Sequence, residues 1–275
     1  MSVKYTPTHV TPEMAADWLE HRNTHNRRFK ESAIQRYMDD LRAGRWKENG
    51  DTIRFDTAGI LSDGQNRLEA CRRTGIGFDT CVVTGLDPDA QATMDQGVKR
   101  SGADVLRLAN TGMENAALTA SIAAADIRRR KGTLADAFRQ GGRNAKPTAG
   151  ELIAHVDAEP RLREAARRGA RVGGRTAGLL SPTCAGFLWL VFDEIDSEDA
   201  AGFMNLFASG AGLEEDDPIL TLRATLTRLN RNKGDQRERA AMTIKAWNKW
   251  RTGRKCSRLG WNPNGARREP FPTPR

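Results

Sequence analysis

The sequence predicts an α+β protein with a small mixed sheet and surrounding helices, followed by an all-helical C-terminal domain. Residues 52–56 alternate apolar and polar side chains, and residues 57–59 supply a turn before a second short strand at 60–61, which predicts a β-hairpin. Residues 80–85 are rich in strand formers and predict a strand beside the hairpin. From about Met113 onward only helical patterns follow, so the sheet belongs to the N-terminal part.

Length and composition predict three segments within the 275 residues. We expect a mixed domain at residues 1–110, a helical domain at 111–230, and a basic, Trp-containing segment at 231–275 that packs on the helical domain. The charged fraction of 29% is typical of a soluble protein. Because the chain has neither an apolar run of about 18 residues nor the apolar core of a signal peptide, we expect a cytoplasmic protein without a membrane partner.

Two helices are predicted ahead of the hairpin. Thr11 as N-cap and Pro12 at the first helical position predict a helix that ends near Glu20, and residues 22–28 then form a loop. A second, amphipathic helix is predicted over residues 32–44. Its apolar side chains recur at helical spacing: Ile34, Tyr37, Met38 and Leu41.

The hairpin leads into a helix at Asp63-Gly64. Residues 65–73 carry apolar side chains at helical spacing before Gly75 ends the helix. One interpretation is structural: Asp63 caps the helix and residues 65–67 are solvated in its first turn. The other is functional, because a helix N-terminus exposes unpaired N–H groups and Gly64 allows a phosphate to approach the backbone closely.

Helical patterns dominate the rest of the chain. The segment 184–195 is the most apolar, and its aromatic stripe predicts a core helix. The segment 161–171 is basic, but nearby acids offset its charge. The predicted helical segments are residues 89–95, a helix capped by Ser101, and residues 116–130, 148–156, 161–171, 184–195, 199–209 and 218–229.

The four cysteines, Cys71, Cys81, Cys184 and Cys256, are widely spaced. They form no Cys-x-x-Cys motif and no Cys/His cluster of zinc spacing, so no metal site is predicted. We expect all four to be reduced and mostly structural, with Cys71 on the buried face of its helix.

The formal net charge of +9 is concentrated at the C-terminal end. Residues 231–275 hold thirteen Lys and Arg against three Asp and Glu, a balance of +10, whereas residues 1–230 have a balance of −1. A basic segment beside a near-neutral body indicates a polyanionic partner, most commonly nucleic acid.

Basic and aromatic side chains alternate within this segment. Trp247 and Trp250 are three residues apart on a predicted helix and are expected to dock inward, while Lys245, Lys249 and Arg251 are expected to face solvent. The structural alternative is a docking helix with a soluble face; the functional one is a DNA-backbone contact surface. The candidate DNA-binding residues are Lys245, Lys249, Arg251, Arg254, Lys255 and Arg258.

Four stretches resemble motifs of the ParB/sulfiredoxin-like superfamily, in particular its phage and actinobacterial members. Residues 59–70 (GILSDGQNRLEA) resemble the DGQHR signature, and residues 44–50 (GRWKENG) resemble its G-x-W-x-x-N-G motif. Asn26-Arg27 lies in the place of the upstream N-R box, and residues 94–101 (MDQGVKRS) resemble M-D-x-G-x-K-R-S. The four stretches occur in the family's order, which makes them more specific together than singly.

The resemblance implies a ParB/sulfiredoxin-like fold and a nucleoside triphosphate ligand, CTP or ATP, with or without Mg. The loop that carries Asn26 and Arg27 would fold back over the phosphate site. The implied nucleotide-binding residues are Asn26, Arg27, Gly64, Gln65, Asn66, Arg67, Lys99 and Arg100. The implied catalytic residues are Asp63, Asn66 and Glu48. As structural alternatives, Glu48 is a solvated turn residue, and Lys99 and Arg100 balance nearby acids.

The signature departs from the family at Asn66, where histidine is usual. Asparagine can donate a hydrogen bond to a phosphate but cannot shuttle a proton near neutral pH. The leading hypothesis is therefore a ParB-like nucleotide- and DNA-binding protein of a phage or mobile element, compatible with a homodimer. The alternatives are an enzyme on the same fold (a nucleotide hydrolase, nuclease or small-molecule kinase) and a structural phage component with a decayed pocket. Peroxiredoxin repair is discounted, because Gln65 stands where sulfiredoxins carry their reactive cysteine.

Overall fold

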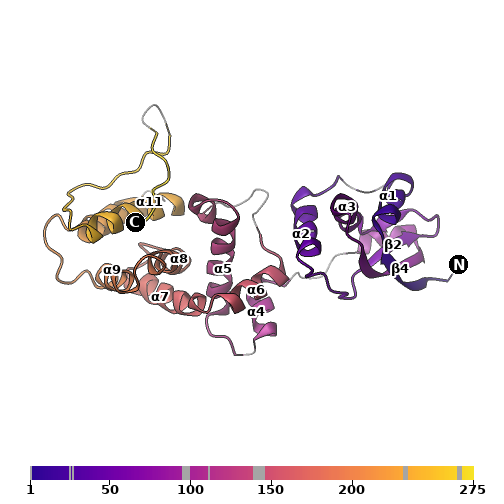
Figure 1. Cartoon of the computed structure of the whole chain (residues 1–275), viewed down its shortest axis with the longest axis horizontal. Coiled ribbons are helices and arrows are strands. Elements are labelled where there is room, and N and C mark those ends of the chain that lie inside the picture. Colours follow the sequence, from indigo (N-terminus) through magenta and orange to yellow (C-terminus); the bar gives the residue numbers. More distant parts are fainter. Residues whose placement is uncertain are drawn as a thin grey trace. The chain divides into compact units, whose positions relative to one another are not determined.

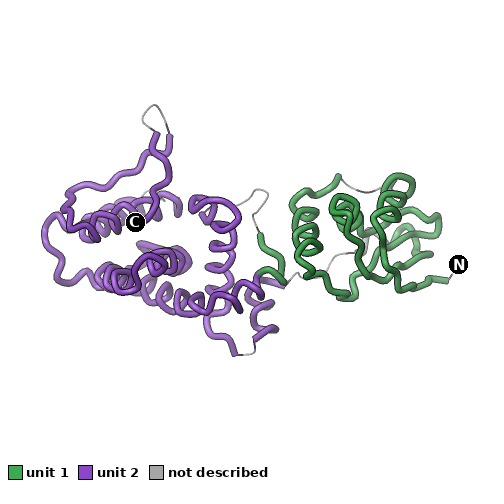
Figure 2. The backbone as a smooth tube through the Cα atoms, viewed as in Figure 1, with its two compact units in different colours: residues 1–99, 141–151 green, residues 100–140, 152–275 purple. Residues whose placement is uncertain are grey.

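The computed structural model divides the chain into two compact units, residues 1–99 with 141–151 and residues 100–140 with 152–275 (Figure 2). The first division falls after residue 99, whereas the sequence predicts a boundary at residue 110. The described residues are 2–24, 26, 28–94, 100–110, 112–138, 146–231, 235–264 and 268–275 (Figure 1).

The first unit combines strands and helices. A short 3-10 helix replaces the predicted helix at residues 89–95. The elements are β1 (Lys4–Val10), α1 (Pro12–His21), α2 (Glu31–Arg42), β2 (Thr52–Asp56), β3 (Leu61–Asp63), α3 (Gln65–Thr74), β4 (Phe78–Leu86) and the 3-10 helix η1 (Pro88–Thr93).

The four strands form one mixed sheet in the order β1-β4-β2-β3. Strands β2 and β3 pair antiparallel, which confirms the predicted hairpin, and Gly59 takes a φ of 76° in its turn. Strand β4 pairs parallel to β2, with Val82 opposite Ile53, as expected for a strand beside the hairpin. The small mixed sheet predicted from the sequence is confirmed.

Strand β1 is absent from the sequence-based prediction. It pairs antiparallel with β4 at the edge of the sheet, and most of its residues are exposed, including Tyr5 at 69%. An edge strand tolerates Pro7, because the N–H that proline lacks is not needed on an unpaired side. The strand is easily missed, because its exposed residues do not show a clear buried face.

Side-chain capping sets the start of α1, whereas α2 begins after Lys30 without a side-chain cap. The Thr11 side chain accepts a hydrogen bond from the Met14 N–H, so α1 starts as predicted. Helix α2 buries Ile34 and Leu41, and its C-terminal end is followed by Gly44 with a φ of 62°. The core of this unit consists mainly of Ile34, Met38, Leu41, Ile53, Phe55, Leu61, Leu68, Cys71 and Phe78.

The second unit contains only helices among its described residues, which confirms the predicted helical domain. Helix α6 begins in residues assigned to the first unit and ends in the second. The elements are α4 (Gly102–Ala109), α5 (Ala116–Lys131), the 3-10 helix η2 (Leu134–Phe138), α6 (Ala149–Ala158), α7 (Arg161–Arg175), α8 (Pro182–Asp193), α9 (Ser197–Ser209), α10 (Pro218–Arg231) and α11 (Gln236–Arg251).

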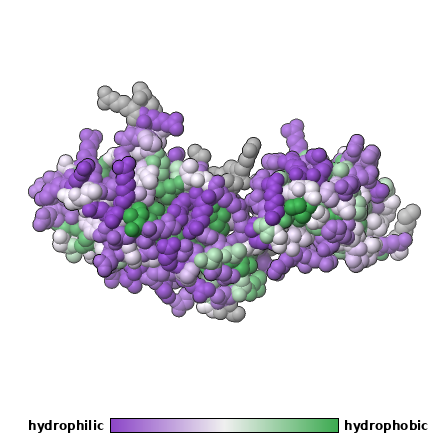
Figure 3. Space-filling view, viewed as in Figure 1, coloured by the Kyte–Doolittle hydropathy of each residue, from purple (hydrophilic) through white to green (hydrophobic). Residues whose placement is uncertain are grey.

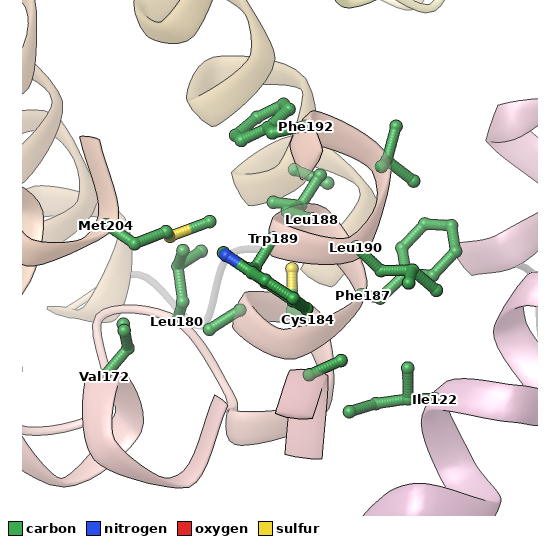
Figure 4. Close-up of a cluster of buried hydrophobic side chains, with 14 of the residues drawn as sticks. Ile122, Val172, Leu180, Cys184, Phe187, Leu188, Trp189, Leu190, Phe192 and Met204 are labelled. Carbon is green, nitrogen blue, oxygen red and sulfur yellow. The ribbon is translucent and has the colours of Figure 1, made fainter. Parts of the chain in front are cut away.

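Helix α8 forms the centre of the second core. Ser181 caps it by accepting a hydrogen bond from the Cys184 N–H, and Pro182 occupies its first turn. Every residue from Cys184 to Phe192 is buried, and Figure 4 shows their side chains among Ile122, Val172 and Met204 from neighbouring elements. The aromatic stripe is thus a packing surface, as predicted.

The C-terminal segment packs on this core. Trp247 of α11 is fully buried, and its ring stacks on Phe192 of α8 at 4.2 Å between centroids. The Trp247 Nε1 donates to the Arg275 carbonyl oxygen at 3.1 Å, which ties the chain terminus to α11. The expected inward docking of Trp247 is confirmed.

Asp126 of α5 is a fully buried carboxylate. Arg129 and Arg130 each approach it to 2.7 Å, and His155 lies at 2.9 Å. Burial opposes the charge of Asp126, but the hydrogen bonds from His155 and the two arginines outweigh it and hold the pKa of Asp126 well below its ordinary value. The network therefore contributes stability at neutral pH, which is lost progressively as the pH falls below about 4.

The surface is mostly hydrophilic, with smaller hydrophobic areas, in the face shown by Figure 3. No helix in the part of the chain that the structure describes is long and apolar enough to cross a membrane.

Helices α7 and α8 approach each other closely through glycine. A Cβ added to Gly169 would lie 2.3 Å from the Pro182 carbonyl oxygen and 2.9 Å from the Gly186 nitrogen, both backbone atoms. Gly174, on the other side of α7, faces open space. The two glycines therefore differ in what they contribute to stability.

We expect Gly169→Ala to lower the free energy of unfolding of the second unit by about 1–3 kcal/mol, because the backbone must move to admit the methyl group. Gly174→Ala is the matched control and should raise stability by up to about 1 kcal/mol through helix propensity. Thermal unfolding followed by circular dichroism measures both, and equal melting temperatures for the two variants would contradict the packing of α7 on α8.

Candidate functional site

The candidate site lies where β3 passes into α3. Gly64 is the N-cap of α3 and has a φ of 110°, and a Cβ at this position would lie 2.4 Å from the Ile53 Cδ1. Glycine is required at this position because other residues rarely adopt this φ and because any side chain would collide with Ile53. Asp63 ends β3 and does not cap the helix, so the structural interpretation of Asp63 as N-cap is wrong.

Arg67 is buried beneath the first turn of α3. Its side chain is 7% exposed, and its NH2 group donates to the Thr52 carbonyl oxygen at 2.8 Å and to the Asp63 carboxylate at 3.1 Å. The Asp51 carboxylate lies 4.0 Å from NH1, but NH1 itself donates no hydrogen bond to a residue that the structure describes. Arg67 thus joins β2, β3 and α3, contrary to the solvated side chain of the structural interpretation.

The loop between α1 and α2 folds onto this junction. The Leu61 N–H donates to the Arg22 carbonyl oxygen at 2.8 Å. The Asn26 amide donates to the Leu61 carbonyl oxygen at 2.5 Å and to Asn23 at 2.8 Å, and Asn23 donates to Gln65 at 3.3 Å. Because both Asn26 amide hydrogens hold the loop, Asn26 positions this segment.

Asn66 fixes the end of the same loop. Its Oδ1 accepts a hydrogen bond from the Lys30 N–H, the residue that precedes α2, at 3.1 Å. The amide orientation follows from the chemistry, because a backbone N–H requires an oxygen acceptor. The Asn66 Nδ2 then remains as a donor with no hydrogen-bond partner among the described residues, and the side chain is partly exposed.

Two carboxylates and a phenol border the guanidinium of Arg67. The side chain of Asp51 is 62% exposed and that of Asp63 is 31% exposed. Burial raises the pKa of Tyr37 on α2, while the charge of Arg67 acts against this rise. The junction thus combines one buried cation, two accessible carboxylates and a rim of amide side chains.

The other predicted site residues are only partly brought together. Glu48 is exposed in the loop between α2 and β2, in keeping with a solvated turn residue. Arg100 is exposed and belongs to the second unit. Arg27 and Lys99 lie outside the described residues, as does most of the MDQGVKRS stretch.

Two residues of the junction were missed by sequence reasoning. Asp51 precedes β2, and Asn23 lies between α1 and the Asn26 position. Asp51 directly follows the GRWKENG stretch, and this position next to a motif was the signal that could have marked it as a site residue. Asn23 offered no signal beyond its place in a polar loop.

The four cysteines form no disulfide. All four are free thiols, and Cys71 is fully buried on α3. Burial raises the pKa of Cys71 to about 11, which keeps it protonated at neutral pH. The structural assignment of Cys71 is confirmed. Among the described residues, no group of three or more His, Cys, Asp or Glu side chains is arranged to hold a metal ion.

The candidate DNA-binding residues differ in their availability. Lys245 lies 2.5 Å from Glu269, and Arg251 lies 2.6 Å from Asp199, so both are partly exposed but paired with acids. Lys249 is partly exposed. The exposed members of the set are Arg254, Lys255 and Arg258, of which Lys255 lies 3.7 Å from Glu214.

Comparisons with protein-family models, with curated proteins and with solved structures find no match to this chain.

We expect Arg67→Ala to destabilise the first unit by about 1–3 kcal/mol, because it leaves the Thr52 carbonyl and the Asp63 carboxylate without their donor. Arg42→Ala, an exposed arginine at the end of α2, is the control and should have little effect. Chemical denaturation followed by tryptophan fluorescence measures the difference, and an Arg67→Ala variant as stable as wild type would disprove the structural role of the guanidinium.

Proposed function

We propose that the chain is a ParB-like nucleotide- and DNA-binding protein whose first unit binds the phosphates of a nucleoside triphosphate at the junction of β3 and α3. The observation that carries the proposal is a pair of donors without hydrogen-bond partners among the described residues: Arg67 NH1, which is buried, and Asn66 Nδ2. A buried donor without an acceptor is costly, and a phosphate oxygen would satisfy it.

The backbone supports the same ligand. A helix N-terminus carries partial positive charge and unpaired backbone N–H groups, and α3 begins at this junction. The loop that carries Asn23 and Asn26 folds onto the junction through its own hydrogen bonds, so the site is formed before a ligand arrives. Preorganisation of this kind lowers the entropic cost of binding.

The carboxylates favour a nucleotide with magnesium. Asp51 and Asp63 would repel free phosphate, but Mg²⁺ is commonly held by one or two carboxylates together with substrate phosphates. These two residues would hold the ion, whose charge would offset that of the triphosphate.

Asn66 favours binding over catalysis. Its oxygen is occupied by the Lys30 N–H, and an amide does not titrate near neutral pH. A residue that holds a loop and donates one hydrogen bond suits a ligand-binding site better than a proton-transfer site. For the DNA-binding part of the proposal, the support is the exposure of Arg254, Lys255 and Arg258 in a basic segment.

The sharpest test replaces Asn66 by aspartate, which keeps the oxygen that accepts from Lys30 and removes the amide donor. We expect Asn66→Asp to fold like wild type and to lose about 10–100-fold in nucleotide affinity, since a hydrogen bond to a charged group contributes about 1.5–3 kcal/mol. Calorimetric titration with Mg-CTP, Mg-ATP and Mg-GTP measures the affinity.

Asn205→Asp, at an exposed position of α9, is the matched control for the change in charge. Asn66→Ala, which removes the loop contact as well, should bind at least as weakly as Asn66→Asp. Equal affinity for wild type and Asn66→Asp, or no binding by wild type at millimolar nucleotide, would refute nucleotide binding at this junction.

A further inference from the structure

We propose that a row of four arginines on α7 is a contact surface for the phosphate backbone of duplex DNA. The row consists of Arg163, Arg167, Arg171 and Arg175, all of them exposed. This inference rests on the DNA-binding part of the proposed function and locates a contact surface outside the basic C-terminal segment.

The row follows from the period of the helix. Residues four apart are neighbours on successive turns of a helix, about 6 Å apart along its axis and about 40° apart around it. The four arginines therefore extend over about 18 Å and wind through about 120° of the helix surface. Two small exposed residues, Ala170 and Gly174, lie beside the row, and Gly174 faces open space. Glu164, whose side chain is 36% exposed, lies on the same side and contacts Arg167. A backbone could therefore approach α7 closely.

The opposite face of α7 fixes the row in place. Leu162, Ala165 and Val172 are buried, and Gly169 and Gly173 pack against the start of α8. The close approach of the two helices prevents α7 from rotating about its axis. The arginine row is therefore a preformed surface.

The charges of the row are largely free. Most contacts of the acids near α7 go to arginines outside the row: Arg161 pairs with Glu159 and Asp193, and Arg168 pairs with Glu164, which also contacts Arg167 of the row. Of the row, only Arg167 has an ion pair within the described residues. Arg163, Arg171 and Arg175 have none, so the acids that offset the segment in the sequence do not neutralise its exposed face.

The row is unfavourable for the free protein. Like charges four residues apart repel one another on a helix. Arg163 also lies in the first turn, where the helix dipole disfavours a positive side chain. A polyanion bound along the row would attract the four arginines and offset the repulsion between them.

The chemistry of the row favours nucleic acid over an acidic protein. Protein interfaces have an apolar centre rich in aromatic residues, whereas the exposed face of α7 presents arginine, alanine and glycine. Guanidinium groups at regular spacing suit the regularly spaced phosphates of one DNA strand, to which arginine donates paired hydrogen bonds. The small residues between them would give the backbone room.

The test neutralises the row with Arg163→Gln, Arg167→Gln, Arg171→Gln and Arg175→Gln in the full chain. Glutamine has nearly the helix propensity of arginine, so the variant should melt at or above the wild-type temperature. Fluorescence anisotropy with a labelled duplex at several salt concentrations measures affinity. The slope of log K against log salt should fall by about 0.9 for each lost contact, and so by roughly three to four.

The matched control removes four charges from exposed residues of the first unit: Lys4→Gln, Arg42→Gln, Lys47→Gln and Lys146→Gln. It should keep the wild-type slope, and an equal loss by this control would show that net charge sets the binding, which overturns the inference. An unchanged slope in the α7 variant, or stronger competition by poly-L-glutamate than by unlabelled DNA, would overturn it too.

A third variant separates this inference from the proposed function. It carries Arg254→Gln, Lys255→Gln and Arg258→Gln in the C-terminal segment. If this variant alone lost DNA binding, the proposed DNA-binding function would stand and the α7 surface would be rejected. A wild-type chain that does not bind the duplex at low salt would reject both.

Discussion

The buried guanidinium of Arg67 is the interaction on which the first unit depends. It reaches the Thr52 carbonyl of β2 and the Asp63 carboxylate at the end of β3 from the first turn of α3. Since Gly64 alone separates β3 from α3, the same contacts set the direction in which the helix leaves the sheet. The polar groups of the candidate site lie around this junction. Arg67 therefore has both a structural role and a proposed role in ligand binding.

The two units are stabilised by different kinds of contact at the positions that matter here. In the first, side-chain amides hold a loop against a strand-to-helix junction, where Arg67 NH1 and Asn66 Nδ2 have no hydrogen-bond partner among the described residues. In the second, helix α8 is buried along nearly its whole length, and glycines let α7 pack against it. The rigid second unit then displays charge on its surface, where Arg163 and Arg171 face solvent without an acidic partner among the described residues.

Local patterns predicted the local features. The cap of α1, the hairpin and the buried helix α8 follow from residues close in sequence. The burial of Arg67 on α3 could not be predicted, because its partner Thr52 lies on strand β2, fifteen residues earlier in the chain. Strand β1 was missed because its exposed edge position leaves no alternation of burial. The pairing of Lys245 with Glu269 depends on the fold of the C-terminal segment, which no periodicity reveals.

The most direct test of the central claim is hydrogen–deuterium exchange of the wild-type chain with and without Mg-nucleotide. We expect slower exchange at residues 22–30 and 64–68, where the loop meets the first turn of α3, because a bound phosphate would stabilise both preformed segments against local opening. Exchange elsewhere in the first unit should change little. Unchanged exchange at both segments at saturating nucleotide, or protection confined to the second unit, would contradict a phosphate site at the junction of β3 and α3.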